Sequence, residues 1–217
     1  MSFPNIDKFL VRKFQERVTE AKLDLGFLVE DTFGDMSQAE RTEIGIYLAR
    51  KEFTTDLRRR EDNQVFIMPN YPLLDMPFPQ IGVSLGQESP ADRFMGDIVG
   101  ESKPIMTNNV QTGWAIPKGY IGSCLYRTDI VCATKDETIW LSRLVQRFIF
   151  EEQENLQEIG AMEIDVTVAD TRPDQMQLPM TVFSRAVQIN CKVENTWTVN
   201  IPLKTVEIGN NTALPIT

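Results

Sequence analysis

The side chains that most enzymes use for proton transfer, nucleophilic attack and metal binding are poorly represented in this chain. It contains no histidine, which excludes Ser-His-Asp and Cys-His catalysis, the zinc-protease helix motif and imidazole metal sites. It also lacks the glycine-rich phosphate-binding motifs Gly-x-x-x-x-Gly-Lys and Gly-x-Gly-x-x-Gly. We therefore predict that the protein is not an enzyme and that it has no cofactor and no metal.

Carboxylates offer the one remaining route to catalysis. Asp165 with Asp170, or Glu88 with Asp92, could form an acid–base or cation-binding pair. A chain with 31 acidic residues offers such pairs by chance, so solvated charge is the favoured interpretation. A carboxylate- or metal-dependent hydrolase is the least favoured alternative.

The three cysteines indicate buried thiols rather than a disulfide framework. Cys124, Cys132 and Cys191 fall in predicted strands. Their odd number and wide spacing do not match the pattern of a disulfide-bonded protein. The N-terminus carries no apolar signal segment, and no stretch is apolar enough to span a bilayer. We expect synthesis and assembly in a reducing cytoplasm.

The net charge of −9 is informative about partners. A nucleic-acid binder needs basic surface to displace counterions, and docking on anionic lipid needs basic surface too. The acidic balance argues against both kinds of partner.

The stretch from Tyr120 to Ala169 organises the expected fold, because it has the pattern of strand, helix and strand. Residues 120–133 are rich in β-branched and aromatic residues. Thr134 and Glu137 form a capping box that predicts a helix start. Apolar residues then recur at helical spacing, at Leu141, Leu144, Val145, Phe148, Ile149, Leu156 and Ile159.

The second strand of this unit follows directly. Gly160 suits the left-handed position after a helix, and Met162 to Val168 alternates between apolar and polar residues, as a strand with one solvated face does. The two strands are either neighbours, with the helix as a right-handed crossover, or non-adjacent in the sheet.

The chain before this unit predicts a second long helix and short strands. Pro4–Leu25 keeps helical spacing, with Asn5 as N-cap and Gly26 as C-cap. Ser37 to Glu40 is a capping box, so 37–52 is either a helix or, because Ile44, Ile46 and Leu48 alternate, a strand. Two short strands follow at Gln64–Met68 and Ile81–Gly86, and Gly82 is expected to permit close backbone approach.

Residues 87–119 have no long period, which is typical of a functional loop or arm. Val110–Ile116 predicts a small hairpin with Thr112-Gly113 in its turn, and Trp114 is a contact anchor if exposed. The equally favoured interpretation is that this hairpin closes the edge of the protein's own core.

After the central unit we expect a polar loop over 170–179 and two closing strands. Val182–Val193 alternates with a phase slip near Arg185-Ala186 that suggests a bulge. Glu194–Thr196 would turn the chain into a last strand, Trp197–Ile201. The segment 209–217 has few apolar anchors and is expected to be mobile.

Together these elements predict one α+β domain over 1–217. One mixed, mostly antiparallel sheet of four to five strands would carry two long helices on one face. Insertions are expected at about 31–78 and 87–119.

The order of elements resembles that of the tail terminator, or tail completion, proteins of contractile-tailed bacteriophages. The resemblance rests on the N-terminal helix Asn5–Leu25, the short strand Phe78–Val83, the unit Tyr120–Ala169 with Leu144–Phe148 in its helix, and the closing strands that include Val182–Val187. It covers about two thirds of the chain as a pattern of elements, without a diagnostic motif.

The resemblance implies a virion protein that forms a homo-oligomeric ring, as a hexamer. Such a ring caps the tail tube and holds the last tail sheath ring, and it connects the tail to the neck or head-completion protein. DNA would pass through without specific binding, because an acidic inner surface repels it. The alternative within structural proteins is another neck, collar or baseplate component.

A ring of copies needs a contact surface, and seven residues are candidates for it. They are polar or aromatic residues of the long loop, the 170–179 loop and the closing strand: Asp92, Arg93, Asp97, Trp114, Arg172, Asp174 and Trp197.

Overall fold

The computed structural model describes residues 6–58, 61, 63–73, 76–92, 101–171 and 182–202, with backbone alone at 90–92 and 195–197. The helices are α1 (Ile6–Ala21), the 3-10 turn η1 (Lys22–Asp24), α2 (Leu25–Phe33), α3 (Gln38–Arg50), α4 (Lys135–Glu151) and α5 (Gln153–Glu158). The strands are β1 (Glu52–Thr54), β2 (Gln64–Met68), β3 (Gln80–Asp92), β4 (Lys103–Thr107), β5 (Val110–Cys132), β6 (Ala161–Thr171) and β7 (Phe183–Pro202).

The fold class is α+β with one mixed sheet, as predicted, but the sheet is larger than predicted. Within the described residues seven strands join it in the order β1-β2-β3-β5-β7-β6, and β4 pairs with β5. β1–β2 and β2–β3 are parallel pairs, whereas β4–β5 and β6–β7 are antiparallel. The prediction of four to five strands was too low, because β1 is very short and β4 and the start of β5 have no clear alternation.

The chain divides into two compact units. One, here called the helical unit, comprises Ser2–Ala91 and Ile121–Glu194; the other, here called the hairpin unit, comprises Met1, Asp92–Tyr120 and Asn195–Thr217. The chain passes from one to the other inside β3, β5 and β7. Each unit is described separately below.

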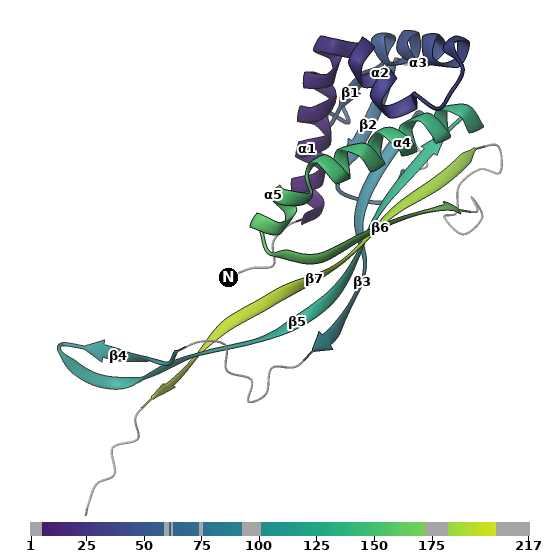
Figure 1. Ribbon diagram of the computed structural model, residues 1–217. Helices are drawn as coiled ribbons and strands as arrows, with labels where there is room; N and C mark the ends of the chain where they lie inside the picture. The colour runs from purple at the N-terminus through teal and green to yellow at the C-terminus, as the bar shows by residue number, and fades with distance from the viewer. Residues whose placement is uncertain are drawn as a thin grey trace, which may run out of the picture. The chain divides into compact units, whose positions relative to one another are not determined.

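The main core of the helical unit lies between the helices and one face of the sheet. Alternate strand residues point into it, among them Ile81, Val83 and Ile130. α1 and α4, which touch each other, cover this face (Figure 1). Helices pack on the sheet, as predicted, and α2 and α3 also contribute to this core, with Phe33 and Ile44 among their buried residues. The helix residues that complete the core include Leu10, Phe14, Leu141, Leu144 and Phe148.

The N-terminal helix ends earlier than its apolar pattern suggests. α1 stops at Ala21, and after η1 the chain enters α2, whose N-cap Asp24 accepts a hydrogen bond from the Phe27 amide. Gly26 therefore lies inside α2, and its prediction as a C-cap was wrong. The predicted N-cap Asn5 lies outside the described residues.

Most of the ambiguous segment 37–52 is the helix α3, and Glu52 begins β1. Ser37 and Glu40 form both halves of the capping box. Ile44 and Leu48 are buried, but Ile46 is exposed, so the residues follow the helical period and the strand alternative was wrong.

The strand–helix–strand unit forms, with its two strands separated. β7 lies between β5 and β6, so the non-adjacent alternative holds. Thr134 accepts a hydrogen bond from the Glu137 amide, and Gly160 has a φ of 101°, as expected. The single long helix is interrupted at Glu152, which divides it into α4 and α5.

The last two predicted strands are one continuous strand, β7, so the predicted turn at 194–196 was wrong. On the β6 side no bulge is present near Arg185-Ala186, because these residues pair regularly with Asp170 and Ala169. The register shift lies on β6 instead, between Met162 and Asp165, where Glu163 has a φ of 50°.

Candidate functional site

The hairpin unit contains a two-residue β-hairpin built from β4 and the start of β5. Asn108 and Asn109 form its turn, with φ values of 51° and 62°. Such a turn needs positive φ at both positions, which asparagine tolerates better than most residues. The prediction of a hairpin over Val110–Ile116 was wrong, because these residues belong to the continuous strand β5 and the turn lies before them. Thr112 lies in β5 and its hydroxyl is 3.2 Å from that of Thr107 across the strands.

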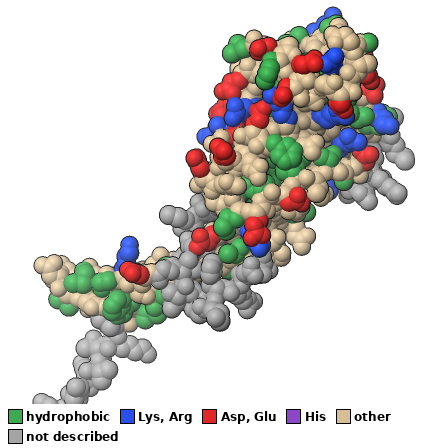
Figure 2. Space-filling view, viewed as in Figure 1, with side chains coloured by type: hydrophobic (Ala, Val, Ile, Leu, Met, Phe, Trp, Pro, Cys, Tyr) green, Lys and Arg blue, Asp and Glu red, His purple; other side chains and the backbone are tan. Residues whose placement is uncertain are grey.

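Large apolar side chains of this unit are exposed. The relative exposures are 56% for Met106, 63% for Val110, 40% for Trp114 and 46% for Ile201. We call these four residues the hairpin surface. Figure 2 shows hydrophobic side chains gathered on the β4–β5 hairpin. No described residue of this unit belongs to a buried apolar cluster. Exposed apolar surface of this kind is typical of contact sites between proteins.

The end of β7 crosses the hairpin backbone at Gly113. A Cβ added to Gly113 would lie 2.6 Å from the Ile201 carbonyl oxygen and 3.3 Å from the Pro202 Cα. Real side chains do not tolerate such an approach, so glycine is required there. This contact places the backbone of Ile201, one member of the hairpin surface, against the hairpin.

Trp114 is the one predicted interface residue whose side chain the structure describes. Asp92 ends β3 and Trp197 lies in β7, but their side chains are outside the described residues, as are Arg93, Asp97, Arg172 and Asp174. Sequence reasoning missed Met106, Val110 and Ile201. Val110, Thr112 and Trp114 occupy alternate positions and are all exposed, so their spacing could have indicated one exposed strand face. Placing the turn at Thr112-Gly113 prevented that interpretation.

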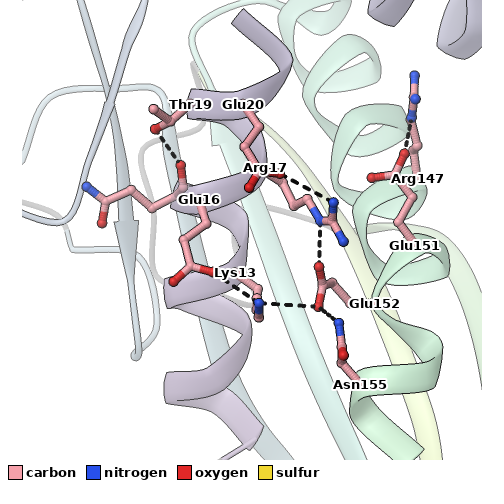
Figure 3. Close-up of polar contacts among 10 residues, drawn as sticks. Lys13, Glu16, Arg17, Thr19, Glu20, Arg147, Glu151, Glu152 and Asn155 are labelled. Atoms are coloured by element: carbon pink, nitrogen blue, oxygen red, sulfur yellow. Dashed lines mark hydrogen bonds and ion pairs between the residues drawn. The ribbon is translucent and has the colours of Figure 1, made fainter. Parts of the chain in front are cut away.

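In the helical unit, a buried carboxylate joins α1 to the α4–α5 junction (Figure 3). The side chain of Glu152 is fully buried, and its Oε1 lies 2.5 Å from Arg17 Nε. Its Oε2 accepts a hydrogen bond from Asn155 at 2.6 Å, and Lys13 Nζ lies 3.9 Å away. Burial would raise the pKa of Glu152, but the bonds from Asn155 and Arg17 outweigh it and hold the pKa below its usual value. The arrangement is a structural ion pair.

A second buried carboxyl lies on β5. Asp129 accepts a hydrogen bond from Arg127 Nε at 2.7 Å, and Arg127 also reaches the Thr171 hydroxyl. Burial raises the pKa of Asp129, and the Arg127 charge only partly opposes this. Among the described residues, no three Cys, Asp or Glu side chains are grouped so that they could hold a metal ion.

The carboxylate pairs considered from sequence have other surroundings. Asp170 accepts a hydrogen bond from Arg185 Nε at 2.7 Å, across β6 and β7, and this bond lowers its pKa. Asp165 is exposed on β6. Glu88 is exposed on β3, and the Asp92 side chain is outside the described residues.

The three cysteines are free and buried in β5 and β7, as predicted. Burial raises the pKa of Cys124 to about 11, and those of Cys132 and Cys191 to about 12. Thiols with such values are protonated at neutral pH and are poor nucleophiles.

Two of the surface hollows in the described part of the helical unit have volumes of about 430 Å³ or more. One, of about 750 Å³, lies between α2 and α4 and is lined by Asp31, Arg143, Arg147 and Phe150 among others. Arg147 is already bonded to the Thr32 hydroxyl and the Glu151 carboxylate, each at 2.7 Å. The other, of about 430 Å³, lies beside the β6–β7 pair and contains the Asp170–Arg185 pair. Arg147 in the first hollow and Arg185 in the second are therefore paired within the protein.

No helix in the described part of the chain has the length and apolar character needed to cross a membrane. No known family model matches the chain, and no curated protein matches it.

Proposed function

We propose that the protein is a structural component of a contractile bacteriophage tail, namely the subunit of a ring that caps the tail tube. The observation that carries the proposal is the hairpin surface. Met106, Val110, Trp114 and Ile201 present apolar area to solvent in a unit whose described residues have no buried apolar cluster. The order of helices and strands, which resembles that of tail terminator proteins, supports the choice of assembly.

A closed ring requires a heterologous contact, in which one patch of each subunit meets a different patch of the next. An exposed tryptophan is a suitable anchor for such a contact, because interface hot spots are enriched in tryptophan. The hairpin surface would meet a neighbouring copy or the tail tube protein. The remaining faces of the ring would contact the tail sheath and the neck protein.

The net charge of −9 is compatible with this role. DNA that moves through a tail must not adhere to the walls of the channel, and an acidic lining repels phosphate. Reversing acidic charges on the lumen of the assembled ring is expected to slow DNA ejection. Unchanged ejection would remove this part of the proposal.

The first test is the mass of the purified protein by analytical ultracentrifugation, with and without tail tubes. We expect a ring-sized oligomer alone or on the tube. Trp114→Ala is expected to weaken self-association by about 2 kcal/mol, roughly 30-fold. Tyr71→Ala, which removes an exposed aromatic side chain of the helical unit, is the matched control and is expected to leave association unchanged. A monomer under all these conditions would contradict the proposal.

The second test is electron microscopy of particles made without the protein. Loss of a tail terminator leaves tails of uncontrolled length. Tails of normal length that fail to join heads would instead indicate a neck or collar component, and absence of the protein from purified particles would exclude both roles.

A further inference from the structure

Among the described strands, β6 stands last in the sheet order. Among the described residues it pairs with β7 alone (Figure 1). The bulge at Glu163 bends only its beginning, and from Asp165 to Thr171 the pairing with β7 is unbroken. The outer edge of such a strand offers backbone N–H and C=O groups to an added strand.

This edge is protected only by the bulge at its start and by its acidic side chains, and it lacks the other devices that prevent strand addition. Proteins protect edges with lysine, proline or very short strands. β4 contains Lys103 and Pro104, and β1 is only three residues long. β6 is 11 residues long and contains no lysine, arginine or proline. Of these three strands, β6 therefore offers the longest edge without lysine or proline.

The charges of β6 restrict what that partner can be. Glu163 is paired with Lys192 at 2.8 Å and Asp170 with Arg185 at 2.7 Å. Asp165 is exposed and forms no ion pair with the described residues. Pairing of β6 with β6 of another copy would bring acidic residues together, so a partner strand that carries a base is favoured.

The chain itself contains a segment of this kind after β7. Fifteen residues (217 − 202) follow Pro202, enough to extend about 50 Å as a strand. Leu203–Ile208 reads Leu-Lys-Thr-Val-Glu-Ile, and threonine, valine and isoleucine favour strands. This segment contains one basic residue, Lys204, and one acidic residue, Glu207. Because the two are three positions apart, their side chains would lie on opposite faces of a strand.

We propose that β6 of one copy accepts residues 203–208 of a second copy as an added strand, with Lys204 beside Asp165. The inference rests on the self-assembly proposed above and supplies one of its contacts. Because donor and acceptor are different parts of the chain, the contact is heterologous and can repeat around a ring.

The test is a charge exchange in the full-length protein, followed by sedimentation equilibrium. Asp165→Lys and Lys204→Glu are each expected to weaken association about fivefold, because each places like charges together. The double variant is expected to recover to within about twofold of the unmodified protein. Glu43→Lys, an equal charge change at an exposed position of α3, is expected to have no effect. Single variants that associate normally, or a double variant no better than either single one, would overturn the inference.

A labelled peptide of residues 203–217 separates this inference from the proposed function. The peptide is expected to bind to the full-length protein in a fluorescence anisotropy titration. Asp165→Lys is expected to weaken this binding, and Glu43→Lys is expected to leave it unchanged. If the protein is monomeric, the ring proposal fails, but the peptide result still decides the role of β6. Absence of peptide binding to a monomer overturns the inference.

Discussion

At the scale of single residues, Glu152 shows how one buried charge determines the course of the chain. It ends α4, begins α5 and bonds to Arg17 of α1. The apolar pattern of the helix continues to Ile159, so the pattern gives no sign of the interruption. A carboxylate in this position is stabilising only while its partners remain, since an unpaired buried charge is costly.

Replacing Glu152 by glutamine is expected to destabilise the protein by about 1–3 kcal/mol, because the bonds to Arg17 and Asn155 lose their charge. Urea unfolding would measure this. Glu20→Gln removes a more exposed partner of the same arginine, 3.3 Å from Arg17, and is expected to cost less than about 0.5 kcal/mol. Equal effects of the two substitutions would contradict the role given to Glu152.

The contribution of Glu152 is expected to depend on pH. Its folded pKa lies below the reference value of 4.5, so the stabilisation is complete above that value. It is lost as the pH falls through the folded pKa, because the unfolded chain binds the proton more tightly. Thermal unfolding of the unmodified protein and Glu152→Gln between pH 7 and pH 3 should therefore show a difference in stability that shrinks only below about pH 4.5.

Gly82 illustrates a close approach that the sequence indicated. A Cβ at this position would lie 2.3 Å from the Asn70 carbonyl oxygen, so Gly82→Ala is expected to cost about 1–3 kcal/mol. Gly45→Ala is the control, because a Cβ there meets only Val29, at 3.9 Å. In α3 it is expected to stabilise by up to about 1 kcal/mol. Chemical denaturation of both variants should give opposite signs.

At the scale of elements, the β4–β5 hairpin depends on its turn. Asn109 has a φ of 62°, a conformation that glycine adopts freely and valine does not. Asn109→Gly is expected to preserve or stabilise the hairpin, and Asn109→Val to disrupt it. Limited proteolysis between residues 101 and 116 would report on this. Equal cleavage of the two variants would show that the turn is not formed as described.

At the scale of the whole molecule, the two units are expected to differ in local stability. β5 residues from Cys124 to Cys132 belong largely to buried clusters, whereas the described side chains of the hairpin unit belong to none. Amide hydrogens over 103–112 should therefore exchange much faster than those over 124–132 in the unassembled protein. Assembly through the hairpin surface should slow exchange over 103–112, and unchanged exchange in the assembled ring would exclude that surface as the contact.

The sequence alone determined the elements whose signals are local. The capping box at Ser37, the N-cap at Thr134, the helical spacing of α4 and the buried cysteines were predicted correctly. Each depends on residues that are close in sequence. Local periodicity also gave the α+β class, because it distinguishes helix from strand wherever one face is buried.

The tertiary structure decided what depends on contacts between distant residues. β7 lies between β5 and β6, and neither strand's alternation specifies its neighbour. Glu152 divides the long helix because Arg17, 135 positions away, is there to bind it. The exposure of the hairpin surface was not predicted, because the turn was expected at Thr112-Gly113 and lies at Asn108–Asn109. A shift in register changes which side chains of a strand are exposed. Sequence periodicity indicates which face of a helix or strand is buried. Only the tertiary structure shows which other residues pack against that face.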